Sequence, residues 1–169
     1  LRGHLRRGAA FRRPRRPPAD GRGQIVDAVS IRDRPAEVAD RAVPGHWEGD
    51  LIIGEDSGSQ AGTLVERTTG FVLLVALPGD RQAVTVAEAL QRQVQTLPAQ
   101  LCKSITWDQG SEMAAHAAFT IATDIAVYFC DPHAPWQRGS NENTNGLLRQ
   151  YLPKGTDLSG YTQADLDEI

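Results

Sequence analysis

Three acidic residues lie where secondary structure is expected to begin or end. Asp50 lies in GHWEGDLIIG, Asp108 follows directly on SITW, and Glu142 lies near the start of the segment NENTNGLLRQY. Hard divalent cations such as Mg²⁺ prefer carboxylate oxygens and complete their coordination shell with water and substrate phosphate. Two such ions, about 3.5–4 Å apart, activate an attacking oxygen and stabilise a leaving one. These residue types therefore suggest metal-assisted phosphoryl transfer, a chemistry that needs no protein nucleophile.

The spacing of the acids alone leaves the choice among them open. An isolated Asp at a strand end is commonly a turn or cap residue, and a Glu in the first turn of a helix is stabilised by the helix dipole. Glu48 shares the strand parity of Asp50, and further acids lie close by in sequence, namely Glu55, Asp56, Glu112 and Asp131. The four histidines have no zinc-ligand spacing, and neither a P-loop nor a Gly-x-Gly-x-x-Gly motif is present.

The elements that must position these acids follow an α/β pattern from residue 45 onward. Apolar and β-branched runs predict strands at 50–54, 62–67, 71–77, 104–107 and 125–130, of which the second and third form a hairpin. Helical spacing predicts helices at 81–97, 112–123 and 141–151. This order predicts a mixed sheet with helices on both faces. It is compatible with a ribonuclease-H-like arrangement and also with other α/β folds.

Charge is distributed unevenly along the 169 residues. Residues 1–34 hold ten arginines against three aspartates, a charge of +7, whereas residues 35–169 hold eight basic groups against 18 acids, a charge of −10. We therefore divide the chain into a basic arm and linker (1–44) and one core domain (45–169). The arm is predicted to be disordered or extended, because it cannot bury enough apolar surface. It is either a solvated linker or a phosphate-binding tail.

Composition also limits the class of protein. The longest apolar run, 71–77, has seven residues, far short of the roughly 20 needed to span a bilayer. No apolar stretch follows the N-terminal charges, so no signal peptide is predicted. Cys102 and Cys130 are predicted to be reduced, buried thiols of a cytosolic protein.

Four ordered blocks carry a family resemblance: GHWEGDLIIG, GTLVERTTGFVLLVALP, SITWDQGSEMA and YFCDPHAPWQRGSNENTNGLLRQYLPKGTDLS. Over residues 28–169 the chain resembles the catalytic core of the IS-thirty family of bacterial insertion-sequence transposases. The resemblance implies a ribonuclease-H-like fold of the retroviral-integrase type. It also implies an Asp–Asp–Glu triad of Asp50, Asp108 and Glu142 that binds two Mg²⁺ or Mn²⁺ ions. The 33 residues between Asp108 and Glu142 suit this family's spacing.

The resemblance further implies an activity and its partners. Such an enzyme cleaves double-stranded DNA at the ends of its element with water and joins the exposed 3′-hydroxyl to target DNA. We expect a homo-oligomer in the active complex, no membrane, and a place in the bacterial cytoplasm, at the nucleoid when DNA is bound. The family also has an N-terminal helix-turn-helix and a basic C-terminal segment that this sequence lacks. The chain is therefore predicted to be a transposase fragment, truncated after the core.

Residues around the triad are candidates for DNA contact. We expect DNA-binding roles for Trp136, Arg138, Asn141, Asn145 and Arg149, and for Arg12, Arg13, Arg15 and Arg16 of the arm. The alternative for those near Glu142 is that they brace the helix by capping and hydrogen bonds. For the whole chain, two alternatives stand beside the transposase. One is a non-catalytic truncated remnant that only binds DNA, and the other is a ribonuclease-H-like nuclease.

Overall fold

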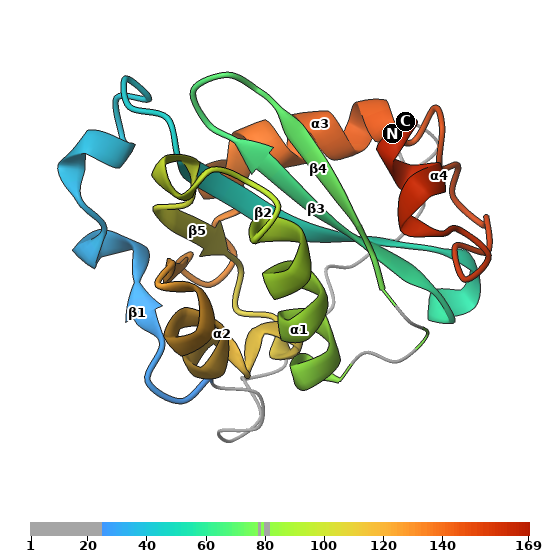
Figure 1. Cartoon of the computed structure of the whole chain (residues 1–169), viewed down its shortest axis with the longest axis horizontal. Helices are drawn as coiled ribbons and strands as arrows, with labels where there is room; N and C mark the ends of the chain where they lie inside the picture. Colours follow the sequence, from blue (N-terminus) through green and yellow to red (C-terminus); the bar gives the residue numbers. More distant parts are fainter. Residues whose placement is uncertain (1–24, 78, 80–81) are drawn as a thin grey trace, which may run out of the picture.

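A six-stranded mixed sheet with helices on both faces forms the centre of the molecule (Figure 1). The computed structural model describes residues 25–77, 79 and 82–169. The strands are β1 (Val29–Ser30), β2 (His46–Ile53), β3 (Gln60–Glu66), β4 (Val72–Ala76), β5 (Ser104–Trp107) and β6 (Ala126–Phe129). Their spatial order is β1-β6-β5-β2-β3-β4. The strands from β1 to β2 are parallel, and β3 and β4 continue the sheet as an antiparallel meander.

Four α-helices cover the two faces of the sheet. They are α1 (Ala83–Val94), α2 (His116–Thr123), α3 (Gly139–Leu148) and α4 (Gln163–Asp167). One hydrophobic cluster joins one face of the sheet to α1 and α2, and a second, smaller cluster joins the opposite face to α3 and α4 (Figure 1). The predicted class, a mixed sheet flanked by helices, is confirmed.

The predicted elements differ from the observed ones mainly at their ends. The strand expected at 50–54 begins at His46, because its first three residues pair with β5. In the helix expected at 112–123, only His116–Thr123 is α-helical, and Ser111–Met113 forms a separate 3-10 turn. The start predicted for α1 at residue 81 lies outside the described residues. Two short elements, β1 and α4, were not predicted.

Side chains along β2 alternate between the two faces of the sheet. Trp47 and Leu51 point into the larger cluster with α1 and α2, whereas Ile52 belongs to the cluster under α3 and α4. Gly49 lies on the face of Trp47, and a Cβ built there would lie 2.1 Å from ring carbons of the fully buried Trp107. Glycine at this position therefore lets the indole lie flat on β2. Glu48, Asp50 and Ile52 lie on the side of β2 that contacts α3.

The N-terminal part of the chain joins the sheet through β1. Val29 and Ser30 pair with β6, and Arg34 donates a hydrogen bond to Thr106 Oγ1 at 3.0 Å. The division of the chain between residues 44 and 45 stays a prediction. Residues 1–24, which include Arg12, Arg13, Arg15 and Arg16 of the basic arm, lie outside the described residues. Among the residues that are described, no helix is long and apolar enough to cross a membrane.

Candidate active site

Two of the predicted acids, Asp50 and Asp108, lie at matching positions relative to the pairing of β2 with β5. Glu48 of β2 is the partner of Thr106 of β5 in a parallel pair. Asp50 follows Glu48 by two residues within β2, and Asp108 follows Thr106 by two residues, directly after the end of β5. Since side chains alternate between the faces of a sheet, both carboxylates project on the face of Glu48 and Thr106. The Asp50 side chain is 26% exposed and that of Asp108 is 44% exposed. The pairing of β2 with β5 thus brings together two acids that are 58 positions apart in the sequence.

A buried arginine joins the two carboxylates. Arg138 Nη1 lies 3.3 Å from Asp50 Oδ1, and Nη2 lies 3.2 Å from Asp108 Oδ2. Nη1 also donates a hydrogen bond to the carbonyl oxygen of Gly49 at 2.8 Å. Burial alone would lower the pKa of Arg138, but the charges of Asp50 and Asp108 outweigh it and raise this pKa above its ordinary value. The arginine is therefore held as a cation between the acids.

The third predicted acid, Glu142, lies in the first turn of α3. It follows Arg138 by four residues and precedes Asn145 by three, and Asn145 Nδ2 donates to Asp50 Oδ2 at 3.1 Å. Residues spaced in this way share one side of a helix. Glu142 itself is exposed. Within the described residues, no three His, Cys, Asp or Glu side chains form a group arranged to hold a metal ion.

Glu48, which the sequence could not separate from Asp50, has a different environment. It is fully buried, it accepts a 2.7 Å hydrogen bond from Arg67 Nη1, and it accepts a 2.9 Å bond from the backbone N–H of Asn141. This carboxylate has no solvent-facing oxygen for a substrate. Its contacts fix β3 and the start of α3 to β2. Glu48 is therefore a structural acid.

The other acids that the sequence offered as alternatives either make structural contacts or lie in an exposed turn. Glu112 accepts a hydrogen bond from Trp107 Nε1 at 3.1 Å. Asp131 pairs with Arg32 at 3.2 Å and accepts from Gln137 Nε2 at 3.1 Å. Glu55 and Asp56 lie in the exposed turn after β2.

The residues predicted to contact DNA fall into two groups. Asn141 is fully buried, and its side chain donates to the carbonyl oxygen of Glu48 at 2.8 Å, which is a bracing contact. Arg149 Nη2 likewise donates to the carbonyl oxygen of Ile53 at 3.1 Å. Trp136, in contrast, is 74% exposed in the turn before α3. The helix is thus attached to β2 largely by polar contacts, with Trp136 at its entrance.

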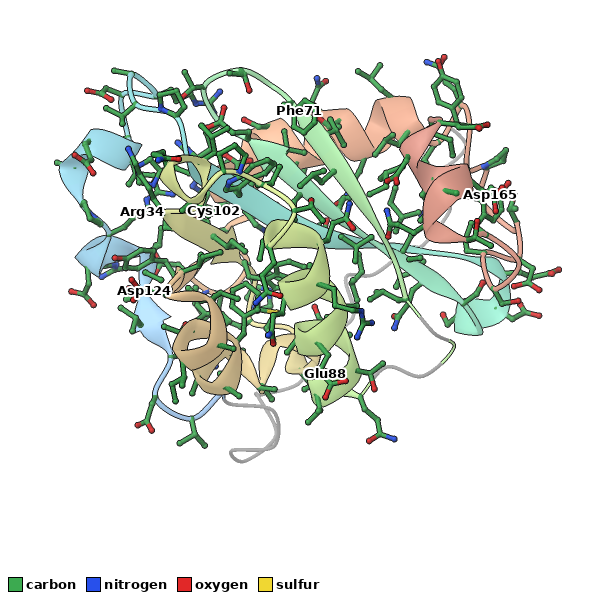
Figure 2. All side chains as sticks on the ribbon, viewed as in Figure 1. Arg34, Phe71, Glu88, Cys102, Asp124 and Asp165 are labelled. Carbon is green, nitrogen blue, oxygen red and sulfur yellow. The ribbon has the colours of Figure 1, made fainter. Side chains whose placement is uncertain are left out.

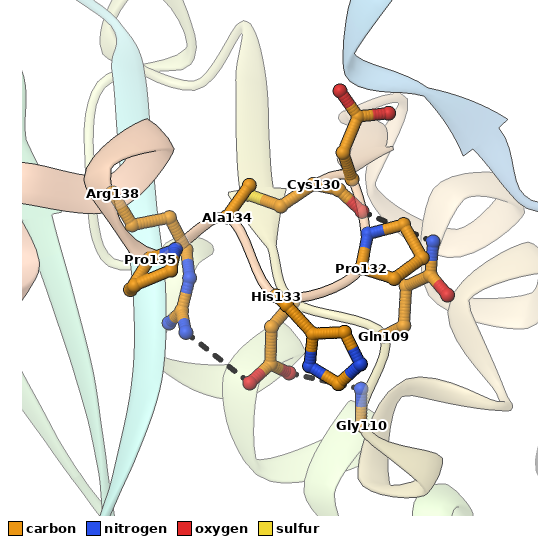
Figure 3. Close-up of a pocket in the computed structure, with 10 residues that line it drawn as sticks. Gln109, Gly110, Cys130, Pro132, His133, Ala134, Pro135 and Arg138 are labelled. Carbon is orange, nitrogen blue, oxygen red and sulfur yellow. Dashed lines mark hydrogen bonds and ion pairs between the residues drawn. The ribbon is translucent and has the colours of Figure 1, made fainter. Parts of the chain in front are cut away.

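A hollow of about 480 Å³ opens beside Asp108 (Figure 3). Its wall is formed by the segment after β5, by the loop 130–135 and by Arg138. Cys130 lies in this wall, and burial raises the pKa of its thiol to about 11. A second hollow, of about 250 Å³, is lined by Asp50, Glu112 and neighbouring residues. The two acids therefore each border open space.

Sequence reasoning missed two features of this site. It placed Arg138 among DNA contacts and did not foresee the bridge to both acids, although its position four residues before Glu142 was a usable signal. It also missed the Glu48–Arg67 pair, which depends on the pairing of β2 with β3 and has no local signature.

The sheet order, the antiparallel β2–β3–β4 meander and the acids on neighbouring parallel strands define a ribonuclease-H-like protein of the integrase type. The chain belongs to the integrase core domain family, which matches residues 40–135. In one solved structure, of a simian T-cell lymphotropic virus intasome bound to a PP2A regulatory subunit, the matching chain has a TM-score of 0.55 and 19% sequence identity. The match covers 64% of this chain and 40% of that chain, and it supports the fold alone.

Curated relatives confirm the predicted resemblance to insertion-sequence transposases. The chain is 56% identical over 165 residues to the transposase for insertion sequence element IS1086 of Cupriavidus metallidurans, covering 98% of this chain and 48% of the relative. It is 48% identical over 169 residues to transposase InsI for element IS30A of Escherichia coli, covering 98% and 44%. A transposase for element IS4351 of Bacteroides fragilis is 38% identical over 149 residues, covering 88% and 45%. The chain spans about half the length of these relatives.

Proposed function

We propose that this chain is the catalytic domain of a DNA transposase, which cleaves DNA strands and transfers them with the help of divalent metal ions. The observation that carries the proposal is the convergence of Asp50 and Asp108, which share the guanidinium of Arg138, at the paired strands β2 and β5. We assign Glu142, in the first turn of α3, as the third acid. The similarity to curated transposases supports the substrate, double-stranded DNA.

The donor chemistry of the three acids suits a hard divalent cation, but among the described residues they are not gathered into one group that could hold an ion. Asp50, Asp108 and Glu142 offer carboxylate oxygens, the ligands that Mg²⁺ and Mn²⁺ prefer, and both aspartates are partly open to solvent. The integrase family generally uses divalent metals, and we assign two Mg²⁺ or Mn²⁺ ions to these three residues. Bound there, two ions would activate the attacking oxygen and stabilise the leaving one.

The surrounding residues of the chain hold the acids in place. Asn145 fixes the Asp50 carboxylate through Oδ2, and the buried Glu48 and Asn141 anchor the first turn of α3 against β2. Trp136 presents an exposed aromatic ring at the entrance of α3. Such a ring stacks on nucleic-acid bases with a gain of about 1–3 kcal/mol per base.

The proposal also covers the basic arm, the oligomeric state and the location in the cell. Arg12, Arg13, Arg15 and Arg16 supply sequence-independent attraction to phosphates, with binding that weakens as salt rises. We propose a homo-oligomer on DNA, acting where the bacterial chromosome lies, in the cytoplasm.

The test is nicking of supercoiled plasmid DNA by the 169-residue chain in Mn²⁺, Mg²⁺ or EDTA. We expect metal-dependent nicking that is lost in Asp108→Asn and Glu142→Gln. The matched control is Glu88→Gln, since Glu88 is an exposed helical acid of α1, the helix on the opposite face of the sheet. Nicking that persists in Glu142→Gln would contradict the triad.

The same assay separates the alternatives. A DNA-binding remnant would shift DNA in a gel in a salt-sensitive way, and deletion of residues 1–18 would weaken the shift, yet no metal-dependent nicking would appear. A ribonuclease-H-like nuclease would cleave an RNA–DNA hybrid in preference to the plasmid.

A further inference from the structure

Arg138 contributes more contacts to the acid pair than any other described residue. Its side chain is only 8% exposed, and its two terminal nitrogens contact Asp50, Asp108 and the Gly49 carbonyl. Its Nε is buried and has no hydrogen-bond partner. Two carboxylates on neighbouring strands thus share one guanidinium as their counter-charge.

The carboxylates that Arg138 contacts are the two aspartates that we assign to the metal. Asp50 Oδ1 and Asp108 Oδ2 face the guanidinium at 3.3 and 3.2 Å. A divalent ion bound by these two carboxylates would lie close to the positive guanidinium, and like charges at close separation repel, the more so because Arg138 is only 8% exposed. One site therefore cannot hold both cations in these positions.

We propose that Arg138 is a built-in counter-cation that competes with divalent metal for Asp50 and Asp108. Without metal, its guanidinium occupies the position between the two acids. Metal binding then requires the guanidinium to move out of that position. This inference rests on the proposed metal-dependent function. It places Arg138 as a positioning residue for the acids and as a determinant of metal affinity.

The space for withdrawal lies next to the arginine. Arg138 is itself part of the wall of the 480 Å³ hollow beside Asp108 (Figure 3). A rotation of its side chain into this hollow would take the guanidinium out of the position between Asp50 and Asp108.

The experiment is titration of the metal-free 169-residue chain with Mn²⁺ by isothermal calorimetry. Replacing the arginine by a neutral residue, Arg138→Gln, removes the competitor, and we expect Kd for Mn²⁺ to fall by about tenfold or more. Arg138→Lys keeps a charge but has a single terminal nitrogen for the two acids. Its Kd should lie between those of the wild type and Arg138→Gln.

Arg149→Gln is the matched control. Arg149 lies at the end of the same helix face, but its guanidinium contacts only the carbonyl oxygens of Ile53 and Leu152. Its loss should leave the Mn²⁺ affinity unchanged. A thermal melt gives a second readout. Arg138→Gln should melt lower than the wild type in EDTA and gain more from saturating Mn²⁺, because binding to the folded state adds stability.

The possible outcomes separate this inference from the proposed function. Wild-type binding that is lost in Asp50→Asn, together with unchanged or weaker binding in Arg138→Gln, would overturn the competition and leave the metal site standing. If Arg138→Gln does not fold, weaker binding by Arg138→Lys than by the wild type would overturn it. Absence of Mn²⁺ binding in every variant would overturn both.

Discussion

The buried pair of Glu48 and Arg67 offers a test of which acid on β2 is structural. Their side chains are 0% and 7% exposed and lie 2.7 Å apart, and Glu48 also accepts from the Asn141 backbone. Figure 2 shows the described side chains on the ribbon. Glu48→Gln keeps the shape of the side chain but removes the charge opposite a buried guanidinium.

The expected cost follows from this burial. Breaking a buried ion pair by removing one partner costs about 3–5 kcal/mol, and we expect the lower end because the Gln carbonyl still accepts hydrogen bonds. For a chain of this length, about 3 kcal/mol corresponds to a melting temperature lower by about 6–12 °C. Glu142→Gln changes an exposed side chain and should shift the free energy of unfolding by less than about 0.5 kcal/mol.

Urea unfolding followed by tryptophan fluorescence, in metal-free buffer, measures both variants. A double-mutant cycle with Arg67→Gln adds a direct readout, because the loss in the double variant should be clearly smaller than the sum of the two single losses. If Glu48→Gln were as stable as the wild type, the structural assignment of Glu48 would fail. Asp50 would then lose its priority as the β2 acid of the site.

Three further perturbations test the frame around the site. Gly49→Ala places a Cβ 2.1 Å from the Trp107 ring, so we expect a loss of about 1–3 kcal/mol and an altered near-UV signal; a wild-type melt would refute this packing. Thr162→Ala removes the capping box with Asp165 at the start of α4 and should cost about 1 kcal/mol in the same urea assay, whereas no loss would mean that α4 is stabilised elsewhere. The Cys130 thiol should resist a thiol reagent at pH 8 in the folded chain, since burial raises its pKa to about 11. Its contribution to the free energy of unfolding should fall as pH rises from about 9 to 11, because the unfolded chain loses this proton first. Fast labelling at pH 8 would disprove the burial of the thiol.

Much of the fold could be predicted from local patterns. β5 was predicted with its observed bounds, because a short β-branched and aromatic run has no helical alternative, and the β3–β4 hairpin followed from the turn at Thr68 to Gly70. Helix α1 followed from the spacing of its buried apolar residues. The bounds of β2 were less accurate, because His46 and Glu48 are buried by pairing with a strand that lies far along the chain.

The site was less predictable than the fold. Its acids could be named only through the family resemblance, since Glu48 and Asp50 have the same parity on β2. What distinguishes them is the tertiary environment: Arg67, directly after β3, neutralises the first, while Arg138, directly before α3, and Asn145 of α3 contact the second. Contacts of this kind depend on strand pairing and helix docking, which no local pattern encodes. The short β1 and α4 likewise depend on docking to the sheet.

The most direct test of the central claim is an anomalous-scattering map from crystals of the chain soaked in Mn²⁺. We expect metal peaks within coordination distance of carboxylate oxygens of Asp50, Asp108 and Glu142, with Arg138 displaced from the acid pair. Metal bound at other residues, or crystals at saturating Mn²⁺ with no peak at these three acids, would contradict it.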